Sequence, residues 1–232
     1  MVDPSRVSEI FSSLQGEGTH LGERHLFIRF EECHIRCVYC DELEKEGEEM
    51  TRSEVMDRVH RLEADEGPHA FVALTGGEPL LYVVFLVPLI RQLKQENFRI
   101  YLETNGILWR ALEAVIDDCN CIAMDMKPSS VTHERNFDFD HRKFLQIAQR
   151  TETFVKIAIS HELDRAEFEN QIRIVAEVAP GVPVILQPVT GVSNDGDIWK
   201  QMNSLEHLQR LGQRWHREIR IMPRFHKIFN LR

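Results

Sequence analysis

Three cysteines close together in the sequence carry its strongest chemical signal. Cys33, Cys37 and Cys40 are spaced C-x3-C-x2-C, so one loop can bring three thiolates to a single metal centre. Three protein ligands leave a tetrahedral zinc, or a fully protein-ligated iron–sulfur cluster, one ligand short. Because an open metal position is where an exogenous ligand binds, the spacing predicts a [4Fe-4S] cluster with one iron left for a cofactor.

A structural zinc site is the alternative interpretation of the three cysteines. A Cys3His site would need one histidine, and His34 is too close to Cys33 for both side chains to reach one metal comfortably. Two adjacent glycines, Gly76 and Gly77, end a later strand and leave room for a ligand against the backbone. A cluster that binds a cofactor needs such a docking surface, and a structural zinc does not.

The other two cysteines and one arginine have simpler environments. Cys119 and Cys121 lie at the edge of an apolar run and have no partners at metal spacing, so they are predicted to be buried core residues. Arg29 lies inside a predicted strand, where a charged group needs a partner. A structural salt bridge and a substrate carboxylate are both open as that partner.

The composition is that of a globular protein of a reducing compartment. The 232 residues, 43% of them hydrophobic, suffice for one barrel-sized domain, expected over residues 1–232. The net charge of −9 argues against a nucleic-acid-binding surface. Five cysteines, three of them in one loop, make a poor disulfide framework. There is no signal-peptide pattern, and the apolar run at residues 80–90 is too short to span a bilayer, so we expect a cytoplasmic protein without membrane contact.

Strands and amphipathic helices alternate along the chain. Apolar runs predict strands at residues 25–30, 70–74, 99–103, 121–126, 153–159, 184–188 and 218–222. Helices are predicted from a capping box at residues 51–54, and at residues 83–96, 108–117, 140–150, 165–179 and 197–214. This order predicts βαβ units and a parallel sheet. With about six or seven strands, we expect an α/β fold that is an incomplete TIM-like parallel β/α barrel.

Polar residues follow nearly every predicted strand. They occupy residues 33–40, 75–78, 103–105, 125–127 and position 187. The carboxyl ends of parallel strands share one rim, where such folds bind ligands, so these residues are expected to form one site. Residues 8–18 are predicted to be a hairpin-like entry to the first strand, and residues 44–49 an acidic, solvated turn.

The chain resembles the radical S-adenosylmethionine superfamily. The cysteine spacing with Tyr39, and Thr75-Gly76-Gly77-Glu78-Pro79 after the second strand, resemble that superfamily's cluster loop and Gly-Gly-Glu motif. Within it the chain is most similar to the 7-carboxy-7-deazaguanine synthases of the queuosine pathway. The similar segments are residues 8–18, 27–30, 103–106, 125–130, 186–188 and 223–227.

The resemblance implies a radical SAM core and a set of site residues. Cys33, Cys37 and Cys40 would hold the [4Fe-4S] cluster, and no side chain would act as the catalyst, because cluster and cofactor carry the chemistry. S-adenosylmethionine would bind at Tyr39, Asp41, Gly77, Glu78, Asp125, Met126, Lys127 and Gln187. The substrate, 6-carboxy-5,6,7,8-tetrahydropterin, would bind at Leu14, Gln15, Gly16, Arg29, Thr75 and His226. Arg29 would pair with the substrate carboxylate.

The chain departs from the family after the third cysteine. The family has Cys-Asp-Thr, with the threonine hydroxyl on Mg²⁺, whereas this chain has Cys40-Asp41-Glu42. A carboxylate is also a hard oxygen ligand, so Glu42 is a possible Mg²⁺ ligand. The family further implies a flavodoxin- or ferredoxin-type electron donor and a homodimer. Alternatives are a radical activase that acts on a partner protein, and a zinc-stabilised binding module.

Overall fold

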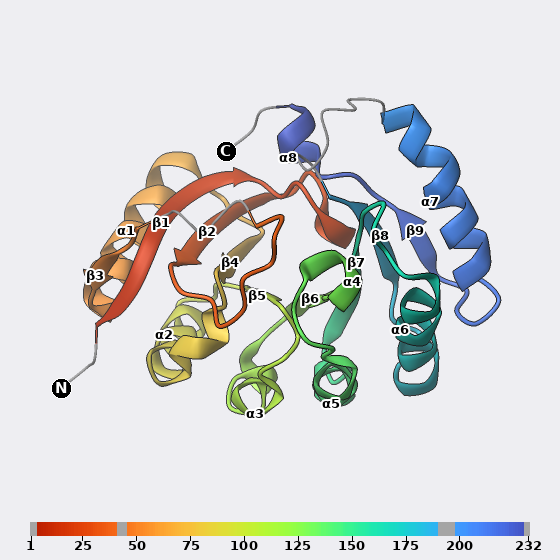
Figure 1. Ribbon diagram of the computed structural model, residues 1–232. Helices are drawn as coiled ribbons and strands as arrows, with labels where there is room; N and C mark the ends of the chain where they lie inside the picture. Colours follow the sequence, from red (N-terminus) through yellow and green to blue (C-terminus); the bar gives the residue numbers. More distant parts are fainter. Residues whose placement is uncertain (1–3, 41–45, 190–197, 230–232) are drawn as a thin grey trace.

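The computed structural model describes residues 4–40, 46–189 and 198–229, which form one nine-stranded sheet in the order β3-β1-β2-β4-β5-β6-β7-β8-β9 (Figure 1). Seven strands lie side by side and run parallel to one another, in the order β2, β4, β5, β6, β7, β8 and β9. Their bounds are Arg24–Phe30, Phe71–Gly76, Ile100–Thr104, Cys121–Met126, Glu152–Ile159, Val184–Pro188 and Ile219–Ile221. These are the predicted seven strands, and the sheet does not close, so the incomplete barrel is confirmed.

The helices follow the strands and pack on the outer face of the sheet. They are α1 (Arg52–Glu66), α2 (Val83–Gln95), α3 (Trp109–Leu112), α5 (Asp138–Ala148), α6 (Arg165–Val178) and α7 (Ile198–Gly212). Figure 1 shows α2, α3, α5 and α6 in a row beneath the sheet, with α8 (Phe225–Ile228) on the opposite side. The predicted capping box starts α1, because the Thr51 hydroxyl accepts from the Glu54 amide and the Glu54 carboxylate accepts from the Thr51 amide.

Several elements differ from the sequence prediction. Strand β1 (Ser5–Leu14) pairs antiparallel with β2, so the hairpin-like entry is a full strand. The predicted acidic turn contains the short strand β3 (Glu48–Met50), which pairs with β1. The helix predicted at residues 108–117 is only the single turn α3 and the 3-10 turn η3 (Ile116–Asp118), and α4 (Ser129–Thr132) and α8 were not predicted. Short turns of this kind carry too little periodicity to stand out in a sequence.

Apolar side chains fill both faces of the sheet. The larger cluster lies between the strands and the outer helices, where Leu74, Leu86 and Phe168 are fully buried. A smaller aromatic cluster inside the curve of the sheet includes Phe71, Tyr101 and Phe154. The β1–β2 connection packs onto this second cluster, because a Cβ added at Gly18 would lie 2.2 Å from the Phe154 ring. The connection therefore covers the aromatic cluster inside the open barrel.

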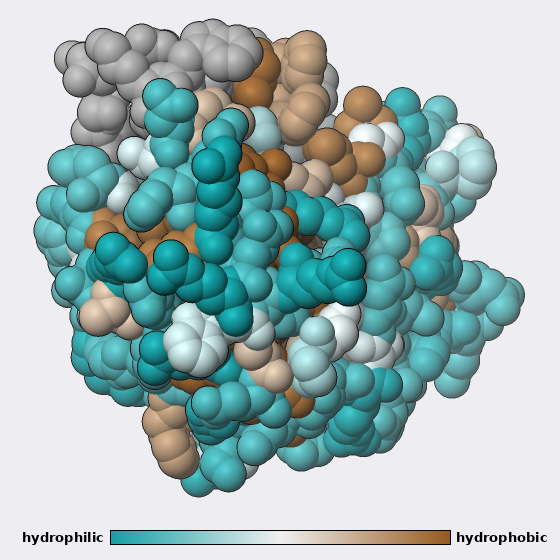
Figure 2. All heavy atoms as spheres, turned by 90° about the vertical axis from the view of Figure 1, so that its right-hand side faces the viewer, coloured by the Kyte–Doolittle hydropathy of each residue, from teal (hydrophilic) through white to brown (hydrophobic). Residues whose placement is uncertain are grey.

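The side of the molecule that carries α7 is mostly hydrophilic (Figure 2). Hydrophobic residues appear there in small separate areas between charged and polar ones. Among the helices of the described residues, none combines the length and apolar character needed to cross a bilayer. A further structural element, the 3-10 helix η1 (Gly18–His20), lies in the β1–β2 connection.

Candidate active site

One cavity of about 400 Å³ lies inside the open barrel and reaches the carboxyl ends of the parallel strands. It gathers most of the residues that the sequence singled out. These are Leu14, Gln15, Gly16, Arg29, Cys33, Cys37, Tyr39, Cys40, Thr75, Gly77, Asp125, Lys127, Gln187 and His226. Asp41 and Glu42 lie outside the described residues, so the structure does not place them.

The three cysteines sit on a small apolar base formed by Ile35, Ile107 and Phe137. The loop is held by backbone hydrogen bonds, including Cys40 N to Cys37 O at 3.0 Å, and Asn105 Nδ2 lies 3.8 Å from Cys33 Sγ. Burial raises the pKa of the Cys33 and Cys37 thiols. Thiols in such a place become good ligands when a metal takes their protons, which is the chemistry of an iron–sulfur or zinc site.

Close backbone packing requires the two glycines at the end of β4, Gly76 and Gly77. A Cβ at Gly77 would lie 2.1 Å from the Glu32 carbonyl oxygen, and one at Gly76 would lie 2.1 Å from the Phe30 carbonyl oxygen. Gly76 also has a φ of 120°, which side-chain-bearing residues rarely adopt. The amides of Gly77 and Glu78 donate to Phe30 O at 2.9 Å and Glu32 O at 2.7 Å. The glycine pair therefore fixes the segment that leads from β2 into the cysteine loop.

The side chains of Glu78 and Met126, two predicted cofactor-binding residues, do not line the cavity. The Glu78 carboxylate is fully buried and accepts hydrogen bonds from Leu80 N, Asn105 N and the Thr104 hydroxyl at 2.8 to 3.0 Å. Burial raises the pKa of Glu78 to about 7. Met126 is fully buried in the core on the helix side of the sheet. The Glu78 side chain thus connects the segment after β4 to the end of β5.

A chain of alternating charges runs along one wall of the cavity. Lys127 Nζ lies 2.8 Å from Asp125 Oδ2, Lys156 Nζ lies 3.2 Å from Asp125 Oδ1, and Lys156 Nζ lies 2.7 Å from Glu17 Oε2. Burial opposes these charges, but the neighbouring carboxylates raise the pKa of both lysines, and the lysines lower the pKa of Asp125. Lys127 Nζ is also 5.8 Å from the centre of the Tyr39 ring. Burial also opposes the charge on Glu17, but Lys156 lowers its pKa, so Glu17, Asp125, Lys127 and Lys156 are charged at neutral pH.

Arg29 forms an ion pair and also lines the cavity. Its Nη1 lies 3.1 Å from Glu9 Oε2, and its guanidinium is 5.2 Å from the centre of the Phe11 ring. It also lines the cavity, where its side chain is 18% exposed. The ion pair with Glu9 orients a guanidinium whose planar set of donors suits a carboxylate ligand.

Glu103 connects two predicted substrate residues. One carboxylate oxygen accepts from Gln15 Nε2 at 2.9 Å, and the other accepts from the Thr75 hydroxyl at 2.8 Å. Gln15 comes from the β1–β2 connection and Thr75 from β4, so Glu103 ties the connection to the rim of the sheet. A carboxylate oxygen can accept more than one hydrogen bond, so Glu103 has capacity left for N–H groups of a ligand.

The chain end covers part of the cavity. Phe225 N donates to Gly16 O at 3.0 Å, and a Cβ at Gly16 would lie 2.4 Å from His226 Nδ1. His226 Nδ1 lies 3.9 Å from Glu17 Oε1. Arg224 and Lys227 line the same end of the cavity. The absence of a side chain at Gly16 thus lets α8 rest directly on the β1–β2 connection.

Among the cavity residues to which the sequence assigned no particular ligand are Glu17, Glu103, Asn105 and Lys156. A signal for Lys156 was available, because a lysine inside the apolar run of β7 needs a partner as much as Arg29 does. Glu103 and Asn105 belong to a polar cluster that the sequence placed on the rim. Glu17 follows two predicted substrate residues directly.

Comparisons with known proteins identify a matching family model, similar sequences and a similar fold. The family model for the radical SAM superfamily matches residues 27–160. A 7-carboxy-7-deazaguanine synthase of Geobacter sulfurreducens is 36% identical over 96% of this chain and 96% of its own length. One of Methanopyrus kandleri is 30% identical over 96% of this chain and 92% of its own length. The crystal structure of QueE from Escherichia coli has the same fold, with a TM-score of 0.64 at 18% identity, covering 96% of this chain and 95% of that one.

Proposed function

The chain belongs to the 7-carboxy-7-deazaguanine synthase family of the radical SAM superfamily, and from that premise we propose how its cavity works. The protein is a lyase that contracts the ring of 6-carboxy-5,6,7,8-tetrahydropterin to 7-carboxy-7-deazaguanine with loss of ammonia, a step of queuosine biosynthesis for tRNA modification. The observation that carries this proposal is that one cavity joins the three cysteines with Arg29 and with the Gln15–Glu103–Thr75 hydrogen bonds.

The cofactors of this family are a [4Fe-4S] cluster and S-adenosylmethionine. Three thiols that line one cavity, share an apolar base and leave a fourth position open form a donor set that fits such a cluster. When bound, the cluster and S-adenosylmethionine supply one-electron cleavage and the removal of a hydrogen atom from the substrate. The protein's own part is to bind both molecules, orient them and exclude water.

Charged residues beside the cysteines are proposed to hold S-adenosylmethionine. Lys127 and Asp125 present fixed charges of both signs, which suits a cofactor that carries an ammonium and a carboxylate group. The backbone at Tyr39 and Gly77 and the buried Gln187 side chain complete the proposed set, with Asp41 from the sequence alone. The Lys127 ammonium also offsets negative charge that thiolates at Cys33, Cys37 and Cys40 would bring.

The opposite wall is proposed to hold the pterin. Arg29 would pair with its carboxylate, and Glu103 would accept from ring N–H groups while Gln15 and Thr75 keep it in place. Leu14, Gly16 and His226 would close the cavity over the substrate. Support for a lid role of the chain end is the hydrogen bond from Phe225 N to Gly16 O.

Other parts of the proposal rest on the family alone. Glu42 would replace the family's threonine as a Mg²⁺ ligand. A flavodoxin- or ferredoxin-type donor would reduce the cluster, and the enzyme would be a cytoplasmic homodimer. One domain over residues 1–232 is supported by the single continuous sheet of the described residues, with an N-terminal substrate segment and a C-terminal tail that closes the site.

The test is anaerobic turnover of the carboxypterin by reconstituted protein, with and without Mg²⁺, followed by the mass of the product. An activase would need a partner protein and would leave the pterin unchanged. A zinc-stabilised module would be colourless and would contain zinc without iron. A product that is lighter than the substrate by one ammonia, formed without any partner protein, supports the proposed function against both.

A further inference from the structure

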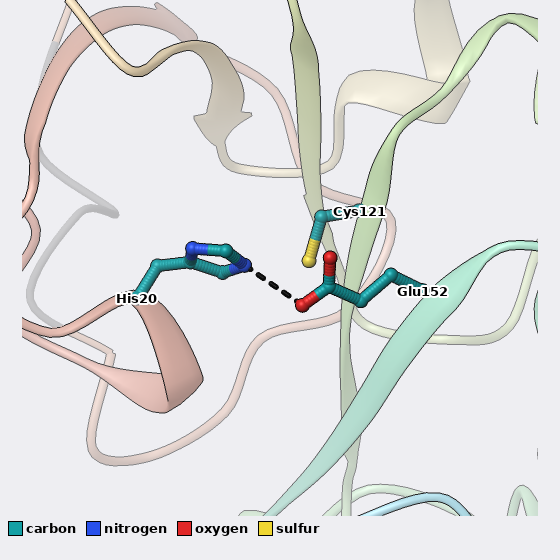
Figure 3. Close-up of side chains that lie close together, drawn as sticks. All are labelled: His20, Cys121 and Glu152. Atoms are coloured by element: carbon teal, nitrogen blue, oxygen red, sulfur yellow. Dashed lines mark hydrogen bonds and ion pairs between the residues drawn. The ribbon is translucent and has the colours of Figure 1, made fainter.

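A second group of side chains of metal-ligating types lies at the end of the sheet opposite the cysteine loop. His20, Cys121 and Glu152 have ligand atoms that all lie within 4.8 Å of one another. Cys121 begins β6 and pairs in register with Glu152 at the start of β7, while His20 ends the 3-10 helix η1. Figure 3 shows the three side chains pointing toward a common point. From Cys121 to Met126, β6 spans roughly 15 Å, so this group is separate from the active site.

The His20 ring lies between two carboxylates. Its Nδ1 is 3.0 Å from Glu23 Oε2, and its Nε2 is 3.0 Å from Glu152 Oε1. A neutral imidazole has one N–H and can donate to only one of them. The second carboxylate therefore needs another cation at Nε2, which is either a second proton or a metal ion. A histidine that donates one N–H to a carboxylate and offers the other nitrogen to a metal is a common arrangement in metalloproteins.

The Cys121 thiol gives the site a soft ligand beside that nitrogen. It is completely buried, whereas the Glu152 side chain is 50% exposed and opens the site to solvent. Burial, together with Glu152 and Glu103, raises the pKa of Cys121, so the free thiol keeps its proton. A bound metal ion would displace that proton and would give the carboxylates the positive charge they lack.

We propose that His20 Nε2, Cys121 Sγ and a Glu152 oxygen bind one Zn²⁺, with water as the fourth ligand on the exposed side. Mixed nitrogen, sulfur and oxygen ligands suit zinc, which accepts four of them in a tetrahedron. Binding releases the proton of the Cys121 thiol and, from the doubly protonated ring, the proton on Nε2. The Nδ1 proton stays on the ring and is donated in a hydrogen bond to Glu23, which orients His20.

The ion would crosslink the β1–β2 connection to the amino ends of β6 and β7. That connection also carries Gln15, Gly16 and Glu17, which line the active-site cavity. The connection already packs on aromatic rings, with the His20 ring centre 4.8 Å from that of Phe71. Zinc would add a crosslink between η1 and the starts of β6 and β7. This site is independent of the proposed reaction, and it is tested by metal content rather than by turnover.

The experiment measures zinc in protein whose cluster is fully loaded, so that Cys33, Cys37 and Cys40 are occupied by iron. Wild-type protein and three variants, Cys121→Ser, His20→Gln and Glu23→Gln, are equilibrated with Zn²⁺ and passed through a desalting column. Cys119→Ser is the matched control, because Cys119 is also buried but packs in the core on the other face of the sheet. We expect one zinc per chain in wild type and Cys119→Ser. Cys121→Ser and His20→Gln should lose it, and Glu23→Gln should bind zinc about 10- to 100-fold more weakly.

A second measurement covers the possibility that Cys121→Ser does not fold. Glu152→Gln changes a half-exposed side chain and should also weaken zinc binding at least tenfold. Co²⁺ in place of zinc should give wild type a thiolate charge-transfer absorption that Glu152→Gln shows only at higher Co²⁺ concentration. The proposal is overturned if cluster-loaded wild type retains no zinc, if its Co²⁺ complex lacks the thiolate band, or if Glu152→Gln binds zinc as tightly as wild type.

Discussion

Lys156 Nζ lies 2.7 Å from Glu17 Oε2, although the two residues are 139 positions apart in the sequence. The contact joins β7 to the β1–β2 connection across the interior of the open barrel. Both side chains are largely buried, at 7% and 15% exposed. Because Lys156 also contacts Asp125, this cation is shared by a residue of the proposed cofactor wall and a residue near the proposed substrate wall.

Replacing Lys156 by Met should destabilise the protein strongly. Two buried carboxylates would lose their shared cation, and breaking a buried ion pair costs about 3–5 kcal/mol. Urea unfolding at neutral pH measures this change, with Lys143→Met on α5 as the control for losing a lysine elsewhere. A free energy of unfolding equal to that of the control would show that the pair contributes nothing.

Replacing Gly77 by Ala should impair loading of the cluster. The added Cβ would collide with the Glu32 carbonyl at 2.1 Å and push away the backbone that leads into the cysteine loop. Gly181→Ala is the control, because a Cβ there meets no atom within 4 Å. Iron per chain after anaerobic reconstitution should fall several-fold in Gly77→Ala only. Equal iron in the two variants would mean that the close approach of the backbone is not needed.

Replacing Arg29 by Ala should reduce pterin turnover while leaving the cluster intact. Loss of a charge that pairs with a buried substrate carboxylate costs a few kcal/mol, so kcat/KM for the carboxypterin should drop by roughly 10²-fold. Arg24→Ala changes an exposed arginine of the same strand and should have little effect. Unchanged kcat/KM in Arg29→Ala would leave Arg29 with only its ion pair to Glu9.

Burial of His141 should make the protein less stable as the pH drops from about 6.5 to about 4. Burial lowers the pKa of His141 to about 4, while an unfolded histidine takes up its proton near pH 6.5. Between these values the unfolded chain binds more protons, so unfolding becomes easier as the pH falls, by up to about 3 kcal/mol for this residue. Urea unfolding of His141→Gln should show a weaker pH dependence over this window than wild type.

The pH experiment has to take a second buried histidine into account and needs a control at an exposed one. The pKa of His25 is also lowered to about 4 by burial, so some pH dependence should remain in the His141→Gln variant. The matched control is His161→Gln, which changes an exposed histidine and should preserve the wild-type slope. If His141→Gln had the same slope as the control, burial of a neutral His141 would not explain acid sensitivity.

The parallel strands and the cluster loop could be predicted from the sequence because their signals are local. A buried run such as that of β6 and the spacing of Cys33, Cys37 and Cys40 are both visible within a few residues. Strand β3 is only three residues long, and its pairing with β1 joins segments some 40 residues apart. Such a short edge strand is defined by its partner rather than by its own pattern.

The cavity residues that the sequence did not assign depend, like β3, on contacts between distant segments. The buried charges of Lys156 and Glu17 compensate each other, and nothing near either residue in the sequence indicates that the two are in contact. Glu78 is a motif residue that the sequence assigned to the cofactor. In the structure its carboxylate accepts hydrogen bonds from the Thr104 hydroxyl and the Asn105 amide, which the motif does not indicate. Motifs thus indicated which strands form the site, and the packing determined which side chains face it.

The proposed reaction of this cavity is the conversion of the carboxypterin to 7-carboxy-7-deazaguanine. The most direct measurement is anaerobic turnover by cluster-loaded protein with S-adenosylmethionine supplied in less than the molar amount of the pterin. A cofactor that takes a hydrogen atom from the substrate and later gives it back is regenerated, so we expect product that lacks one ammonia to accumulate beyond the amount of S-adenosylmethionine added. Cleavage of S-adenosylmethionine without any such product would contradict the account.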